Sequence, residues 1–369
     1  MDFFVPMLRW SIALFRVFGI RLEVHASFVL LLAYAASAGL AEGGVALMAW
    51  SVCFVLLVFT VVVMHELGHC FAARRYGIRT HRILLLPIGG MAEFAEIPRE
   101  PRRELVIAVA GPLVNYAFIA LLLLGFGWPQ GLAGVGVPTA WAEVPAVLLY
   151  VNLLMGVFNL LPAFPMDGGR ILRALLATRL DYLVATRWAA RTGQVLALGC
   201  AALAAADWRE HGLLAVLFLF IAYGAETEYR FVRSRELYSG LIVANVTRSD
   251  FVGFSPETSI GAAFETLRRT VAQDLLLIGA SGPVGIVPRS RFAAALRAGG
   301  EHDPLALHAV HDFAVLQAEW PLLSVLRDLR RGKQRLYPVY SAGRLIGVCD
   351  ARRVDEGVRL IRQTTRRAW

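Results

Sequence analysis

The sequence predicts a polytopic α-helical membrane protein followed by a cytoplasmic α/β domain. Hydrophobic residues make up 57% of the 369 residues, whereas soluble domains are about 45–50% apolar. Long apolar runs recur up to residue 224, and from about Leu241 the runs shorten, charged residues return and Pro/Gly turns appear. We therefore expect two domains, a membrane-embedded one over residues 1–235 and a cytoplasmic one over residues 241–369.

About six transmembrane helices are predicted. The segment 1–24, which precedes them, carries Arg16 and Arg21 among apolar residues, and we expect it at the membrane interface as a helix or a strand pair around residues 18–20. The last two spans are short for a bilayer that needs about 20 residues. The six predicted spans are residues 26–41, 46–71, 104–126, 146–164, 193–206 and 212–224.

Two short apolar runs flank a Pro-x-Gly-Gly turn at residues 87–90, between the second and third predicted spans. Such runs around a Gly-rich turn predict a β-hairpin, here over residues 83–94. Because the segment is too short and too broken to cross a bilayer, we expect a membrane-associated hairpin that packs against the helices.

The arginines indicate how the chain is oriented in the cell membrane. The segments 1–24, 72–103, 170–191 and 230–235 are rich in arginine, whereas the turns on the other side hold Arg209 as their only basic residue. Because positively charged loops stay in the cytoplasm, a multi-pass protein with both termini cytoplasmic is predicted. The net charge of +9 then needs no nucleic-acid partner, since no basic stretch is interleaved with exposed aromatic residues.

A candidate metal motif ends the second predicted span. His65 and His69 are four residues apart, so on a helix they share one face and can hold one metal ion. Glu66 stands beside them and can act as a base on a water molecule that such an ion activates. The alternative is two packing histidines and a solvated glutamate, but ionisable groups at the edge of a bilayer-length apolar run are costly unless they have a function.

A zinc hydrolase needs a third protein ligand and an open position. Asp167 is the best candidate, because the second and fourth spans end on the same predicted side of the membrane; the alternative is that Asp167 caps the following helix. His25 and His81 are rival ligands, each isolated and flanked by polar or basic residues. Asn159 is a candidate donor to a developing oxyanion, or else a polar contact between helices.

These motifs resemble those of the site-2 protease family of intramembrane zinc metalloproteases. The resemblance covers about residues 10–225. It is carried by His65-Glu66-Leu67-Gly68-His69, the hairpin, Ala110-Gly111-Pro112-x-x-Asn115 and Asn159-x-x-Pro162-x-x-Pro165-x-Asp167-Gly168-Gly169.

The resemblance implies one Zn²⁺ per chain, with His65, His69 and Asp167 as ligands, Glu66 as general base and Asn159 assisting at the scissile carbonyl. It also implies that the hairpin offers an edge strand to an unwound substrate. Such a substrate is a single-pass or membrane-anchored protein, and strand addition supplies the hydrogen bonds that an unwound helix loses.

Residues 241–369 contain two similar units, each in the order helix, strand, Gly turn, strand, helix. They resemble a tandem CBS (cystathionine-β-synthase-type) module, which often binds adenine nucleotides. Such repeats usually end in Gly-Ile-Val-Thr-x-x-Asp, and here both usual acids are arginine, Arg291 and Arg353. A nucleotide sensor and a structural module that forms a homodimer are therefore both open.

The sequence as a whole predicts a zinc endopeptidase that cuts membrane-embedded or membrane-proximal segments near the cytoplasmic face. Two rival hypotheses are a metal-handling transporter regulated by the tail, and an inactive relative that only binds membrane partners. A transporter seldom needs a glutamate between two ligands, and a scaffold has no use for His, Glu, His and Asp together.

Overall fold

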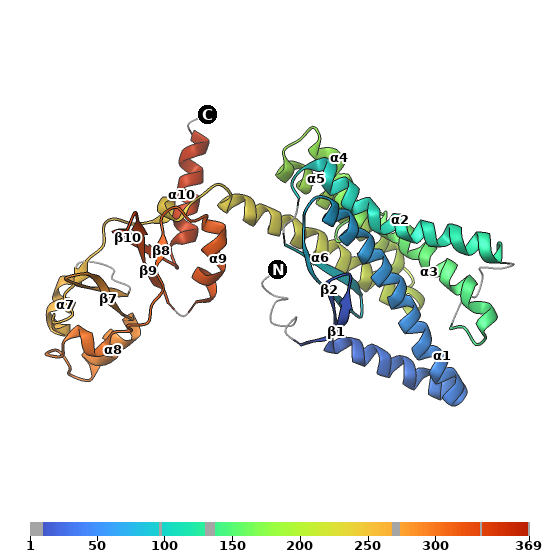
Figure 1. Cartoon of the computed structure of the whole chain (residues 1–369), viewed down its shortest axis with the longest axis horizontal. Helices are drawn as coiled ribbons and strands as arrows, with labels where there is room; N and C mark the ends of the chain where they lie inside the picture. Colours follow the sequence, from blue (N-terminus) through green and yellow to red (C-terminus); the bar gives the residue numbers. More distant parts are fainter. Residues whose placement is uncertain (1–9, 96–97, 130–136, 268–273, 333, 368–369) are drawn as a thin grey trace. The chain divides into compact units, whose positions relative to one another are not determined.

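The computed structural model describes the chain except for residues 1–9, 96–97, 130–136, 268–273, 333 and 368–369 (Figure 1). The first nine residues of the predicted interfacial segment 1–24 thus lie outside the described residues. The chain divides into two compact units, Met1–Val232 and Arg233–Trp369.

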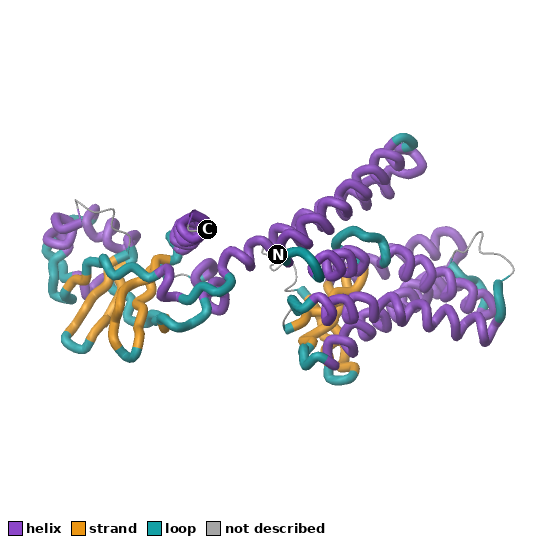
Figure 2. Tube along the Cα trace, turned by 90° about the horizontal axis from the view of Figure 1, so that it is seen from above, coloured by secondary structure: helices purple, strands orange, loops and turns teal. Residues whose placement is uncertain are grey.

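A four-stranded sheet lies beside one end of the helices of the first unit (Figure 2). The outer pairs, β1 with β2 and β3 with β4, are antiparallel hairpins, whereas β2 and β3 pair in parallel. The sequence predicts the second hairpin and, near residues 18–20, either a helix or a strand pair; the structure has the strand pair, and the sequence does not predict that the two hairpins join into one sheet. In order across the sheet the strands are β1 (Ser11–Val17), β2 (Ile20–His25), β3 (Thr80–Leu86) and β4 (Gly89–Phe94).

Helix α1 (Ala26–Arg75) is two antiparallel arms rather than one rod (Figure 1). The backbone leaves helical geometry at Gly43 and Gly44, where Gly44 has a φ of +69°. The contact between the rings of Phe28 and Phe59 shows that the chain reverses there. Their centroids lie 4.5 Å apart although 31 residues separate them in sequence. The two arms correspond to the first two predicted spans.

Five helices of the described residues are long and apolar enough to cross a membrane: α1, α2, α3 with the short helix before it, α5 and α6. The predicted spans 193–206 and 212–224 are too short, since α5 and α6 each continue through polar flanks. The predicted span 146–164 is too long, because α3 ends before the prolines of the following loop. The bounds are α2 (Pro101–Phe126), η2 (Trp141–Glu143), α3 (Val144–Asn159), α4 (Asp167–Ala177), α5 (Tyr182–Ala205) and α6 (Trp208–Tyr238).

The short helix α4 is fixed by a buried arginine. Arg173 is 1% exposed, pairs with Glu104 of α2 at 2.5 Å and with Glu228 of α6 at 2.9 Å, and lies over the rings of Phe164 and Tyr182. A buried guanidinium is tolerated because its charge and donors are paired. The network ties α4 to α2 and α6, and so fixes where α4 begins.

The second unit contains two three-stranded sheets, β5-β6-β7 and β10-β9-β8. Each predicted repeat is present, as α7-β6-β7-α8 and α9-β9-β10-α10, and each has an additional two-residue strand before its first helix. The bounds are η3 (Val243–Val246), β5 (Gly253–Phe254), α7 (Ile260–Leu267), β6 (Leu275–Gly279), β7 (Gly282–Val287), α8 (Arg289–Arg297), η4 (Leu305–His308), β8 (Leu316–Gln317), α9 (Leu322–Arg331), β9 (Leu336–Ser341), β10 (Arg344–Asp350) and α10 (Val354–Arg367).

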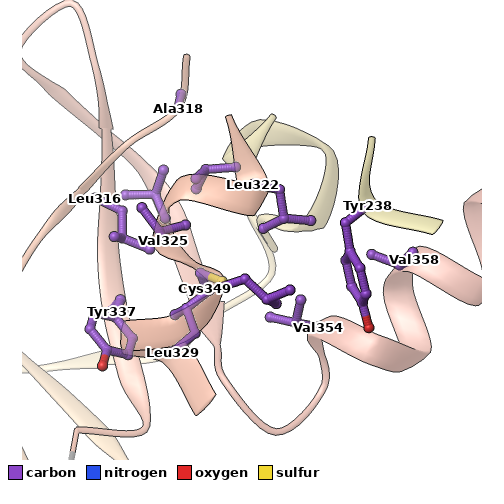
Figure 3. Close-up of a cluster of buried hydrophobic side chains, with 13 residues drawn as sticks. Tyr238, Leu316, Ala318, Leu322, Val325, Leu329, Tyr337, Cys349, Val354 and Val358 are labelled. Atoms are coloured by element: carbon purple, nitrogen blue, oxygen red, sulfur yellow. The ribbon is translucent and has the colours of Figure 1, made fainter. Parts of the chain in front are cut away.

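The second repeat is organised around a buried apolar cluster (Figure 3). Tyr238, at the end of α6, packs into it beside Val354 and Val358 of α10. Burial raises the pKa of the Cys349 thiol in this cluster to about 12, so Cys349 acts as a small apolar core residue. A further cluster contains Leu276 of one sheet and Leu336 of the other, so the two sheets share a core.

Candidate metal centre

Two histidines project from one face of the second arm of α1. His65 and His69 are 2% and 4% exposed, and the helical repeat places the two rings edge to face with their centroids 4.8 Å apart. Their Nε2 atoms lie 3.1 Å apart and point to the same place. The helix therefore presents two nitrogen atoms to one point, as the spacing predicts.

Asp167, the first residue of α4, completes a triangle with the two histidines. Its Oδ2 atom lies 3.1 Å from Nε2 of His65 and 3.1 Å from Nε2 of His69. Met166, not Asp167, occupies the N-cap position of α4, so the side chain of Asp167 does not act as the cap. A Cβ atom on Gly168 would lie 2.1 Å from the carbonyl oxygen of Leu161, so the tight turn before α4 needs glycine there.

The three converging atoms fit a zinc ion. Nδ1 of His69 donates to the carbonyl oxygen of Ile107 at 2.7 Å, and a neutral ring with its proton on Nδ1 leaves Nε2 bare. A bare ring nitrogen beside a carboxylate oxygen and a second ring nitrogen calls for a cation. Tetrahedral zinc with bonds of about 2.0–2.1 Å separates its ligand atoms by about 3.3 Å, close to the observed 3.1 Å. Their role as zinc ligands stays a prediction.

Helix α2 forms the wall behind the two rings. A Cβ atom on Gly111 would lie 2.3 Å from Nε2 of His69 and 2.7 Å from Nε2 of His65. One turn further along α2, Oδ1 of Asn115 lies 2.6 Å from Nδ1 of His65. The sequence alone gives no role to either residue, although a Gly-Pro pair followed by an asparagine within an apolar span was the available signal.

Glu66 lies next to the triangle but is not part of it. Its side chain is half-buried, and its Oε2 atom accepts a hydrogen bond of 3.2 Å from the backbone N–H of Ala92 in β4. A Cβ atom on Gly90 would lie 2.7 Å from Cγ of Glu66, so the hairpin packs directly on this side chain. The structure thus brings the predicted base and the predicted hairpin into contact.

The remaining candidates make contacts outside the triangle. Asn159 donates to the carbonyl oxygen of Met155 in its own helix at 3.0 Å. His25 accepts a hydrogen bond from the N–H of Ser27 at the start of α1, and His81 is exposed on β3. Within the described residues, the group of three or more metal-ligating side chains that converge is His65, His69 and Asp167, and neither rival ligand is part of it.

Comparison with known proteins gives a consistent set of similarities. The model of the family described as peptidase family M50 matches residues 53–141 and 132–200. The zinc metalloprotease MJ0392 of Methanocaldococcus jannaschii is 38% identical over 254 residues, which cover 69% of this chain and 70% of that protein.

Two solved structures resemble separate parts of the chain. A site-2 protease from Methanocaldococcus jannaschii is 37% identical, with a TM-score of 0.44, and covers 60% of this chain and 95% of that one. The CBS-pair protein CBSX2 from Arabidopsis thaliana is 22% identical, with a TM-score of 0.30, and covers 35% of this chain and 99% of that one.

Proposed function

The chain belongs to peptidase family M50, the family of the site-2 proteases, and on this premise we propose that it is an intramembrane zinc endopeptidase. Its substrates are single-pass or membrane-anchored proteins, cut within or next to the membrane near the cytoplasmic face. The observation that carries the proposal is the triangle of His65, His69 and Asp167, with Glu66 beside it, which joins the second arm of the apolar helix α1 to the start of α4.

The protein's own groups have distinct tasks in this reaction. Zinc held by the triangle would polarise the substrate carbonyl as a Lewis acid. Glu66 takes a proton from the attacking water and later gives it to the leaving amine nitrogen. The amide of Asn159 has two N–H groups, and the contact with Met155 uses one, so the other serves as donor to the substrate oxygen.

The hairpin β3–β4 is proposed to hold the substrate. A helix hides its own backbone amides, so a substrate must unwind locally before its peptide bond reaches the site. Strand β4 lies at the edge of the sheet and contacts Glu66, so a strand added to this edge would place its backbone next to the base.

The arginine distribution supports a cell-membrane location with both termini in the cytoplasm. In the second unit, Asp274 accepts from the N–H of Arg289 at the start of α8, and Asp350 accepts from the N–H of Arg352 before α10. Each carboxylate thus occupies one N–H group at or just before a helix N-terminus, the kind of position that attracts phosphate. A structural module that forms a homodimer and an adenine-nucleotide sensor are both compatible with these contacts.

The first test is the zinc content of the purified full-length chain, measured for the wild type, His65→Ala and Asp167→Ala. We expect about one zinc per wild-type chain and its loss in both variants. Zinc retained by Asp167→Ala would refute the triangle. Cleavage of reconstituted single-pass substrates, with Glu66→Gln as inactive control, then tests the reaction, and zinc flux into proteoliposomes would instead favour the transporter.

A further inference from the structure

Two asparagines are buried in the apolar part of the first unit, and the proposed reaction uses neither. Asn115 of α2 is fully buried and Asn152 of α3 is 1% exposed. A buried amide group is costly unless its donors and acceptor are paired, and more so in a helix surrounded by lipid, where water cannot replace a lost partner. Both amide groups therefore need polar partners within the protein.

The two amides form a continuous chain of hydrogen bonds that ends at a candidate ligand. Nδ2 of Asn152 donates to the carbonyl oxygen of Leu148 at 2.8 Å. Oδ1 of Asn152 accepts from Nδ2 of Asn115 at 3.0 Å, and Oδ1 of Asn115 lies 2.6 Å from Nδ1 of His65. The chain joins the backbone of α3 to the imidazole ring on α1 through α2.

The direction of this chain follows from its first member. The carbonyl oxygen of Leu148 can only accept, so Asn152 must turn its NH₂ group to it and its oxygen to Asn115. Asn115 then turns its NH₂ group to that oxygen and its own oxygen to His65. Since an amide oxygen only accepts, Nδ1 of His65 must carry the proton, and Nε2 is left bare toward Asp167.

The two histidines therefore reach the same state by different means. His69 donates directly to the backbone carbonyl of Ile107, which cannot be reversed. His65 faces an amide side chain, which could present either its oxygen or its NH₂ group. A second amide, fixed by a backbone carbonyl, removes this ambiguity, and that explains why Asn115 is accompanied by Asn152.

We propose that Asn115 and Asn152 are positioning residues that set the proton of His65 on Nδ1 and thereby raise the affinity of the triangle for zinc. Partners of this kind typically contribute 10–100-fold to metal affinity. The inference rests on the proposed zinc site but not on proteolysis, so metal binding alone can test it. A purely structural role, joining α2 to α3, would instead make metal loss follow loss of stability.

The test compares zinc affinity, by competition with a chelator, and the melting temperature of the metal-free full-length chain in detergent. Asn115→Leu removes the acceptor for His65, and we expect zinc affinity to fall 10–100-fold. Asn115→Asp keeps an acceptor there but loses the donor to Asn152, so it should melt lower yet bind zinc within about threefold of the wild type. Asn152→Leu, which leaves His65 untouched, should weaken zinc binding by about tenfold.

Thr186→Val is the matched control. Thr186 is also fully buried in the first unit and donates to the carbonyl oxygen of Tyr182 at 2.7 Å within its own helix α5. We expect unchanged zinc affinity whatever its melting temperature. Wild-type affinity in Asn115→Leu, or equal zinc loss in Asn115→Asp and Asn115→Leu, would overturn the inference while leaving the zinc site intact. A wild type that binds no zinc would overturn both.

Discussion

Replacing Gly111 by alanine tests how closely α2 constrains the ligand triangle. The added Cβ atom would lie 2.3 Å from Nε2 of His69, 2.5 Å from its Cε1 atom and 2.7 Å from Nε2 of His65. Real Cβ atoms keep more than 3.0 Å from such neighbours, so either the rings or the helix must move by most of an ångström.

The rings have little room to retreat. Nδ1 of His69 is held at 2.7 Å by the carbonyl of Ile107, and Nδ1 of His65 at 2.6 Å by Asn115. Metal sites tolerate ligand displacements of about 0.2 Å. We therefore expect Gly111→Ala to weaken zinc binding by at least 100-fold, whereas overpacking should cost about 1–3 kcal/mol of stability.

The assay is zinc affinity by chelator competition, together with the melting temperature of the metal-free protein. Gly125→Ala is the matched control, because Gly125 lies on the same helix and an added Cβ atom there meets nothing within 4 Å. That variant should bind zinc like the wild type and be slightly more stable, since alanine favours helix over glycine by up to about 1 kcal/mol. Unchanged zinc affinity in Gly111→Ala would refute the argument.

Four further outcomes are expected. Glu66→Gln should keep zinc and lose at least 100-fold in cleavage rate, measured on a reconstituted substrate. Gly90→Ala, which crowds Glu66, should reduce cleavage while zinc content stays at the wild-type level. Arg173→Met removes the partner of the buried Glu104 and of the half-buried Glu228 and should cost about 3–5 kcal/mol, seen as a large drop in melting temperature. Burial alone would raise the pKa of Glu23, but hydrogen bonds from Arg82 and a serine outweigh it and hold the pKa below its usual range. The stability that the Glu23 carboxylate contributes is therefore present above about pH 4.3 and is lost as the pH falls further. In Glu23→Gln, the melting temperature should therefore fall less steeply as the pH is lowered below this value.

The candidate ligands were predictable because their signals are local. The four-residue spacing of His65 and His69 fixes a shared helix face, and the arginine distribution brings the end of the fourth span to the same side as the second. Gly111, Asn115 and Asn152 could not be assigned in this way. These residues act through contacts between helices, from α2 to α1 and from α3 to α2, and the spacing of residues within one helix does not reveal such contacts.

The extent of α5 was also missed, for a physical reason. A hydropathy window finds residues 193–206 but not the arginine-bearing turns before them. The helix is buried there through small side chains at every fourth position, namely Ala185, Ala189, Gly193, Ala197 and Ala201. A stripe of small residues lets helices pack closely even where the mean hydropathy is low. The four-residue spacing of small residues was therefore a better signal for the extent of α5 than hydropathy.

The metal ligands and the base are held with different firmness. Each histidine ring is fixed by α2, and Asp167 is fixed by a glycine turn and by the buried network of Arg173. Glu66 is held by a single N–H of an edge strand at 3.2 Å. Rigid ligands lower the cost of assembling the metal site, whereas a base that carries a proton from water to the leaving amine must reach two places. Metal affinity and turnover are therefore controlled by different parts of the chain, and variants of β4 should change turnover without changing metal affinity.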